Sequence, residues 1–167
     1  MKEHERRSEI GTVLRRLSED SNTFVRHGRL SAPARPAAWR GHLAPQIHTV
    51  AREATATWAK MDCWVQAQPA VGDVEAGMAP IGLDGAAAVM ARFASVDLGH
   101  GVELMDPHRA LDLAARVIDL LGPDALWWTN HDADCHSWTA MTGCTFDGVV
   151  AGTDGTLFAV LLQAVED

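Results

Sequence analysis

The chain has 167 residues, of which 47% are hydrophobic and 22% are charged, a composition typical of a globular protein. No apolar run approaches the roughly 20 residues that cross a bilayer, and residues 1–20 lack the apolar segment of a secretory signal, so we expect no membrane contact and a cytoplasmic location. We expect a single α+β domain in which residues 1–20 form an N-terminal helix, residues 21–44 a basic arm rich in proline and alanine, and residues 45–167 the core.

The formal charge of −8 is unevenly distributed along the chain. Residues 1–60 hold eleven lysines and arginines against six acidic residues, whereas residues 61–167 hold three against sixteen. This asymmetry bears on partners rather than on fold. The acidic part should repel nucleic acid and anionic membranes, while the basic part could hold an anionic partner or pair with the acidic part of the same chain.

The N-terminal helix is predicted by one narrow apolar stripe, formed by Ile10, Val13, Leu14 and Leu17. Such a stripe is wide enough to dock a helix on a core but not to bury it.

The segment after this helix is basic, since residues 21–52 contain no acidic side chain. Its prolines and small residues disfavour regular structure, so we interpret residues 21–44 as an extended arm over the surface. Arg35, Trp39 and Arg40 could then contact nucleic acid or an acidic protein, with the indole as the stacking group. Alternatively, the arginines pair with the acidic half of the same chain.

Three further helices are predicted from apolar residues at spacings of three and four. The first covers residues 45–68, with a proline in its first turn, and the second covers residues 85–94. The third covers residues 107–121, where Asp106 is the N-cap and Gly122 ends the helix.

Strands are predicted where short apolar runs stand between turn residues. Their ranges are 78–81, 96–105, 125–129 and the two arms of a C-terminal hairpin.

The hairpin turn is predicted at Asp154 and Gly155, because this dipeptide suits a two-residue turn with Thr153 and Thr156 as the closing pair. Residues 157–165 are apolar on both faces, so this strand should be covered by helices on one face and by another layer or a second subunit on the other. The sequence therefore predicts a three- to five-stranded, mainly antiparallel sheet packed by about four helices, with a homodimer through the sheet as one way to cover its second face.

Ligand-type side chains gather directly after the strand at 125–129. Zinc takes three or four nitrogen, sulfur or oxygen ligands, so this cluster is the candidate metal site. Asp132, Asp134 and His136 are then the catalytic candidates of a metal-assisted hydrolase. In an extended segment, however, alternate residues lie on opposite faces, so that the whole cluster cannot bind one ion. The alternative interpretation is a polar crossover whose side chains close turns. The candidate zinc ligands are His131, Asp134, Cys135 and His136.

A cysteine nucleophile is a further hypothesis, with Cys135 or Cys144 beside a histidine. The acidic surroundings disfavour a thiolate, and three cysteines are too few for a disulfide framework. Common phosphate-binding, metalloprotease and serine-hydrolase motifs are missing from the sequence.

The chain has six tryptophans and no tyrosine. Two of them, Trp127 and Trp128, are adjacent on a predicted strand and must point to opposite faces. One of the two is then in the core, and the other lies under a helix, in a pocket or at an interface. Trp138 follows the ligand-type cluster and could line the same pocket, where a cation or an aromatic ring could bind. Core packing is the alternative interpretation.

Three function hypotheses follow. The first is a small cytosolic, bacterial or phage-encoded binding protein that engages a protein partner through its acidic C-terminal half, by analogy of charge and size with immunity proteins, antitoxins and inhibitors. The second is the metal-assisted hydrolase, with zinc as its one cofactor, and the third is an accessory protein that contacts nucleic acid through the basic arm. For the first hypothesis the binding residues are Trp128, Trp138, His131, Asp132 and Asp134.

Overall fold

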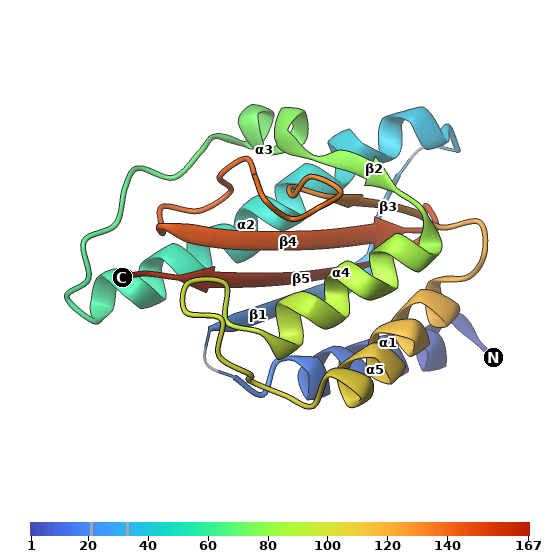
Figure 1. Cartoon of the computed structure of the whole chain (residues 1–167). Coiled ribbons are helices and arrows are strands. Elements are labelled where there is room, and N and C mark those ends of the chain that lie inside the picture. Colours follow the sequence, from blue (N-terminus) through green and yellow to red (C-terminus); the bar gives the residue numbers. More distant parts are fainter. Residues whose placement is uncertain (21, 33) are drawn as a thin grey trace.

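Helices cover both faces of a central five-stranded antiparallel sheet (Figure 1). This computed structural model describes residues 1–20, 22–32 and 34–167. The strands are β1 (Thr23–Arg29), β2 (Ala79–Ile81), β3 (Leu126–Thr129), β4 (Phe146–Thr153) and β5 (Leu157–Val165), in the spatial order β1-β5-β4-β3-β2. The α-helices are α1 (Glu3–Leu17), α2 (Trp39–Lys60), α3 (Val71–Gly77), α4 (Leu83–Ser95) and α5 (Pro107–Leu121). The predicted α+β fold with a C-terminal hairpin is confirmed.

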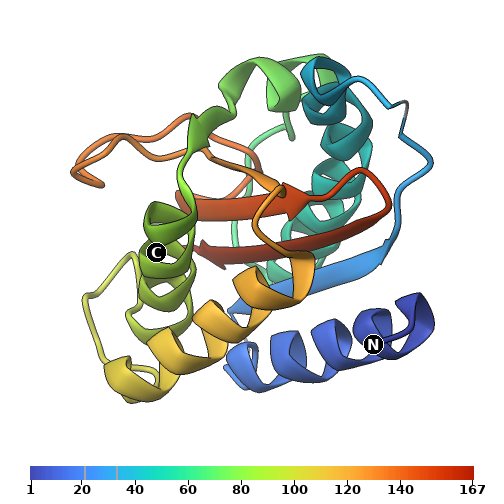
Figure 2. The same ribbon diagram turned by 90° about the vertical axis from the view of Figure 1, so that its right-hand side faces the viewer.

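The two sides of the sheet carry separate hydrophobic cores. Figure 2 shows the helices that lie on the two sides of the sheet. One core packs α1, α4 and α5 on the sheet, and the other packs α2 and α3. The alternation of β5 supplies both: Leu157 and Leu161 face the first core, whereas Phe158 and Leu162 face the second. The second layer predicted for this strand is therefore built by the chain's own helices.

The helices with agreeing sequence signals form where they were predicted. In α5, the Asp106 carboxylate accepts a hydrogen bond from the backbone N–H of Arg109 at 2.8 Å, and Gly122 ends the helix with a φ of 94°. Helix α4 begins two residues earlier than predicted, after Gly82, and Asp84 lies in its first turn rather than at its N-cap. The whole predicted stripe of α1 is buried.

The predicted surface arm differs from the structure. Within residues 21–44, Thr23–Arg29 form strand β1, which pairs antiparallel with β5, and Pro36–Ala38 form a 3₁₀ turn that leads into α2. The edge of β5 offers backbone hydrogen bonds to this polar segment, a contact that no local pattern encodes. The parts of the predicted arm at Ser21 and Pro33 lie outside the described residues.

Helix α2 also differs from its predicted range. It begins at Trp39 and ends at Lys60, and Pro45 lies inside it rather than in its first turn. Apolar residues such as Leu43 and Ile47, which lie on either side of this proline, are both buried on the sheet, so packing extends the helix toward its N-terminus.

The segment predicted as a strand at 96–105 forms a loop instead. Within it, Val96 and Glu103 make an isolated antiparallel bridge. Two glycines in this segment, Gly99 and Gly101, favour a loop over a continuous ladder.

The hairpin is present, but its register is shifted by two residues from the prediction. Thr153 pairs with Phe158 rather than with Thr156, so the loop consists of Gly155 and Thr156. Gly155 has a φ of 91°, a left-handed conformation that favours glycine. A shift of two residues keeps every side chain on its predicted face, whereas a shift of one would have exchanged the faces.

Among the described residues, none of the helices combines the length and the apolar character needed to cross a bilayer.

Candidate functional site

A buried carboxylate holds the loop of residues 130–145, which joins β3 to β4. Asp147 is 1% exposed, and its Oδ2 accepts hydrogen bonds from the backbone N–H groups of Met141 and Thr142 and from the Thr142 hydroxyl, each at 2.9 Å. Its Oδ1 accepts a fourth from Asn130 Nδ2 at 2.8 Å. Burial raises the pKa of Asp147, while these four donors lower it by favouring the carboxylate.

Asn130 completes the attachment of the loop. Its side-chain oxygen accepts a hydrogen bond from the backbone N–H of Val149 at 2.7 Å, and its Nδ2 also donates to the carbonyl of Thr139 at 2.9 Å. The two buried side chains therefore bind both ends of the loop to each other and to β4. Figure 2 shows this loop, in orange, projecting from the body of the molecule.

His131 lies on the same side of its strand as Trp127, four residues earlier, and is 7% exposed. Its ring lies between Phe93 and Trp138, with centroid distances of 4.8 Å and 5.8 Å. Nε2 lies 2.8 Å from the carbonyl oxygen of Asp147. A carbonyl only accepts, so Nε2 carries the proton and Nδ1 of the neutral ring is a bare acceptor.

The Nδ1 atom of His131 is buried and has no hydrogen-bond partner within residues 1–20, 22–32 and 34–167. Burial lowers the pKa of His131, and the positive charge of Arg92 lowers it further. The hydrogen bond from the ring to Asp147, together with the carboxylates of Asp147 and Asp132, acts in the opposite direction. The neutral imidazole is thus the form that this site favours.

These side chains surround a small recess at one end of the sheet. Its volume is about 80 Å³, and the 38% exposed indole of Trp138 forms its outer wall. The recess is lined by Arg92, Leu98, His131, Cys135, Trp138, Phe146 and Asp147.

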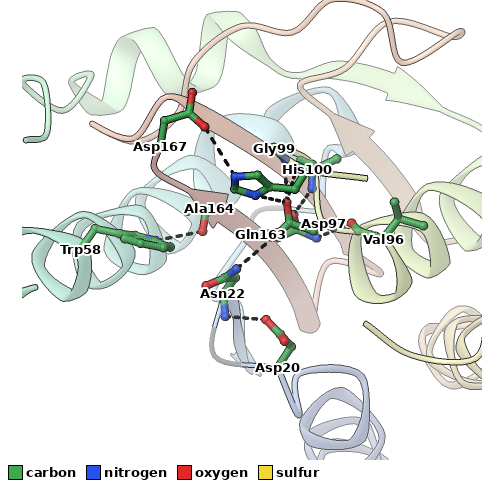
Figure 3. A network of polar contacts seen from close by, with 11 residues as sticks. Asp20, Asn22, Trp58, Val96, Asp97, Gly99, His100, Gln163, Ala164 and Asp167 are labelled. Atoms are coloured by element: carbon green, nitrogen blue, oxygen red, sulfur yellow. Dashed lines mark hydrogen bonds and ion pairs between the residues drawn. The ribbon is translucent and has the colours of Figure 1, made fainter. Parts of the chain in front are cut away.

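A second buried polar side chain, Gln163 on β5, holds the backbone at Leu98, one of the residues that line the recess (Figure 3). Its Nε2 donates to the carbonyls of Phe93 at 2.6 Å and Val96 at 2.8 Å, and its Oε1 accepts from the N–H of Leu98 at 2.7 Å. The end of α4 and the start of the next loop are therefore joined to the centre of the sheet.

Asp97 continues this network towards the surface (Figure 3). Its Oδ1 accepts from the backbone N–H groups of Gly99 at 2.9 Å and His100 at 2.7 Å, and lies 3.1 Å from His100 Nδ1. Its Oδ2 accepts from Asn22 Nδ2 at 3.3 Å. These hydrogen bonds close the turn at 97–100. Nε2 of the exposed His100 ring lies 3.8 Å from Oδ1 of Asp167.

The structure separates the residues of the predicted cluster into two groups. His131 and Cys135 line the recess, whereas Asp132, Asp134 and His136 are exposed on the outer side of the loop.

The Asp132 carboxylate closes the turn of this loop. It accepts from the backbone N–H of His136 at 2.8 Å and from the Ser137 hydroxyl at 2.9 Å. These hydrogen bonds, that of Ser137 first, lower the pKa of Asp132.

Of the two interpretations of the tryptophans, a shared recess and core packing, Trp128 and Trp138 do not share a recess. Trp138 stacks on His131, while Trp128 is buried in the core under α2 on the other face of the sheet. Its neighbour Trp127 faces the α4 and α5 core, as the strand period requires.

No group of three or more histidine, cysteine, aspartate or glutamate side chains in the described part of the chain is placed to hold a metal ion. The zinc site and the hydrolase stay predictions. Of the two candidate nucleophiles, Cys144 is buried, and burial raises the pKa of its thiol to about 11, which keeps it protonated at neutral pH.

The three predicted contacts of the basic segment do not form one surface. Arg35 is exposed, Trp39 is buried against the hairpin turn, and Arg40 donates to the carbonyl of Met78 at 3.2 Å. The nucleic-acid hypothesis stays a prediction, with Trp39 in the core rather than available for stacking.

Three important side chains of the site were not identified from the sequence: Arg92, Asp147 and Gln163. A signal existed for the last two, because each is a polar residue inside a strand that is otherwise apolar. A polar side chain that is buried in a sheet needs hydrogen-bond partners, and those partners mark the loops that it holds. Arg92 carries no such signal.

No protein-family model matches this chain, and searches of curated proteins and of solved structures found no significant match.

Proposed function

We propose that the protein is a small cytosolic binding module that engages a basic protein partner through its acidic C-terminal half, as immunity proteins, antitoxins and inhibitors do. The contact surface is the outer side of the 131–138 loop with the indole beside it. Its central residues are Asp132, Asp134 and Trp138. We call these three residues the loop surface.

The observation that supports the proposal best is the way this loop is held. Burying a carboxylate is unfavourable unless it is hydrogen-bonded. Asp147 accepts four hydrogen bonds, all from residues of the 130–145 loop. A loop held in this way presents its outer side chains in one arrangement. Binding then loses little conformational entropy, which is how pre-organised surfaces gain affinity.

The side chains that the loop presents suit a basic partner. Asp132 and Asp134 are exposed, and Trp138 offers a half-exposed indole of the kind that acts as an anchor at interfaces. The end of β5 lies at the same end of the sheet, since Phe146 pairs with Val165, and adds the carboxylates of Glu166 and Asp167. Acidic groups around an apolar anchor accelerate association with a basic surface.

The test is reversal of charge at Asp134, which among the described residues has no hydrogen-bond partner and can be changed without disturbing the turn that Asp132 closes. Partners are captured on the immobilised protein from a bacterial extract and identified, and the Kd of the purified partner is measured at two salt concentrations. Asp134→Lys should weaken binding about tenfold, mainly through a slower association rate, and Trp138→Ala should weaken it by a similar factor through faster dissociation.

The matched control is Asp119→Lys on the exposed side of α5, which changes the net charge equally at a distance from the loop. It should leave the Kd within about twofold of the wild type. Equal Kd values for the wild type, Asp134→Lys and Trp138→Ala would exclude the loop surface as the contact.

A further inference from the structure

We propose that the recess beside Trp138 binds a planar group that donates a hydrogen bond to His131 Nδ1 and accepts one from Arg92, of which a primary carboxamide is the smallest example. Such a group has a donor and an acceptor at the two ends of one flat unit.

The first argument is the unpaired acceptor on His131, a side chain that lines the recess. His131 is more than nine-tenths buried, its Nε2 proton is donated to the Asp147 carbonyl, and its Nδ1 has no partner among the described residues. A buried acceptor without a partner is unfavourable, so an occupant that donates is stabilising there. A carboxylate has no proton to donate at neutral pH and does not satisfy this atom.

The second argument is the charge at the recess. Arg92 lines it, is exposed, and makes no ion pair with any described residue. Its guanidinium repels an ammonium or guanidinium occupant and offers N–H donors to an oxygen. Together the two side chains require a neutral occupant with both a donor and an acceptor.

The third argument is size and shape. The recess has a volume of about 80 Å³, well below the roughly 300–1,000 Å³ of pockets that hold drug-sized ligands, so it suits a small group. Trp138 stacks at 19° to the His131 ring, and Leu98 and Phe146 are the apolar walls. Flat aromatic walls favour a planar occupant.

The fourth argument concerns the side chain that moves when an occupant enters the recess. Nδ1 is shielded from water, so the occupant must displace something. Asp147 and Gln163 hold the backbone on both sides, whereas the Trp138 indole is half-exposed and makes no hydrogen bond to any described residue. The indole is therefore the wall that shifts when the recess is filled.

The carboxamide can come from the side chain of an asparagine or glutamine on a protein partner, or from a free small amide. Only the first source rests on the proposed function.

The chemistry is tested on the full chain with acetamide as the probe, and with acetone, acetate and methylguanidinium as controls that lack the donor, are anionic or are cationic. The ¹⁵N shift of His131 Nδ1 and the indole N–H of Trp138 are followed by NMR. Acetamide should bind with a Kd in the millimolar range, about 1–10 mM, and move the Nδ1 resonance as a hydrogen bond forms, while the three controls bind at least fivefold more weakly. The proposal is overturned if acetone binds as tightly as acetamide, or if the Nδ1 resonance does not move on addition of acetamide.

Two variants separate recognition from loss of folding. Arg92→Met keeps an unbranched exposed side chain without the guanidinium and should weaken acetamide binding at least threefold, whereas Arg52→Met, on the other side of the sheet, should not change it. Equal affinity in Arg92→Met and the wild type overturns the role of the guanidinium, and with it the proposal.

A competition experiment identifies the source of the carboxamide. Saturating acetamide should weaken binding of the captured partner if the partner inserts a side chain, and should leave it unchanged if the ligand is a free amide. The two proposals can also fail separately. If Asp134→Lys weakens partner binding but acetamide does not bind, only this inference is excluded. If acetamide binds but Asp134→Lys leaves partner binding unchanged, only the proposed function is excluded.

Discussion

The two ends of the β4–β5 hairpin are held by different means. At the turn end, Asp154 pairs with Arg6 at 2.7 Å and accepts from the N–H groups of Thr156 and Leu157, while Gly155 lies against the ring of Trp39. At the loop end, the buried side chains of Asp147 and Gln163 hydrogen-bond to the backbone of the 130–145 loop and of residues 93–98. The outward side chains of Arg92 and Trp138 make no hydrogen bond there to any described residue, and neither does the buried Nδ1 of His131.

This difference separates a structural end from a candidate site. A turn whose polar atoms have partners and whose glycine packs on an indole has no unmet interaction to offer. At the loop end the polar atoms of Asp147 and Gln163 are satisfied, whereas the buried Nδ1 of His131 and the outward side chains of Arg92 and Trp138 have no hydrogen-bond partner among the described residues. Such an arrangement is typical of a binding site built on a rigid support.

The largest expected effect comes from comparing the two carboxylates. Asp147→Asn replaces an acceptor oxygen by an N–H₂ group among four donors, and should lower the free energy of unfolding by about 3 kcal/mol. Asp154→Asn keeps the turn acceptor and loses only a partly exposed ion pair, so it should change stability by about 1 kcal/mol or less. Urea unfolding at pH 7 measures both, and equal losses would remove the distinction between the two ends.

The second prediction concerns the other buried support. Gln163→Leu keeps the volume but leaves the carbonyls of Phe93 and Val96 and the N–H of Leu98 without this partner, which should lower the free energy of unfolding by about 2 kcal/mol. Hydrogen exchange should accelerate at Leu98 and its neighbours while the turn at Gly155 keeps its protection. Uniform acceleration along the chain would show that Gln163 supports the whole sheet rather than this wall.

The third prediction is a loss of stability on mild acidification. Burial lowers the pKa of His131, and burial together with nearby arginines lowers that of His27, so both rings bind a proton more readily in the unfolded chain. Their stabilising contribution is present above about pH 6.5 and is lost as the pH falls through the lower folded-state pKa, by at most about 1.4 kcal/mol per pH unit for each ring. Urea midpoints at pH 7.5, 6.5 and 5.5 measure the slope, which His27→Gln should reduce. The raised pKa of Asp147 acts in the opposite direction, so the wild type is compared with His27→Gln, and equal slopes in the two proteins would contradict the lowered pKa of His27.

The smallest effect is on thiol reactivity and leaves stability unchanged. Burial raises the pKa of Cys144 to about 11, so this thiol should resist iodoacetamide at pH 8, whereas the partly exposed Cys63 and Cys135 should react. Mass spectrometry of the native and the unfolded protein measures the three rates. Acetamide at saturation should slow alkylation of Cys135 alone, because Cys135 lines the recess and Cys63 does not.

Local patterns predicted much of the fold. The capping and period signals of residues 107–121 predicted α5 to its exact bounds, because each signal concerns neighbours within a few turns. The apolar character of residues 157–165 on both faces predicted a strand with cover on both sides. The same reasoning failed for β1, because its partner, the edge of β5, lies more than a hundred residues away in the chain.

The candidate site was predicted only in part. The density of ligand-type side chains identified the loop, but the assignment of faces assumed an extended segment, whereas the backbone turns back on itself between Asp132 and Ser137. The sequence pattern could not supply Arg92 or Phe93, which come from α4, or show that Trp128 lies on the opposite face of the sheet from Trp138.

The sequence by itself determined the helices with clear caps and period and the C-terminal hairpin, because these signals act over a few residues. Only the tertiary structure decided that a histidine would be enclosed between two aromatic rings, with one ring nitrogen that has no hydrogen-bond partner in the described part of the chain. The reason is physical: the proton on Nε2 of His131 is set by a backbone carbonyl of another strand, and that pairing exists only after β3, β4 and α4 have packed together.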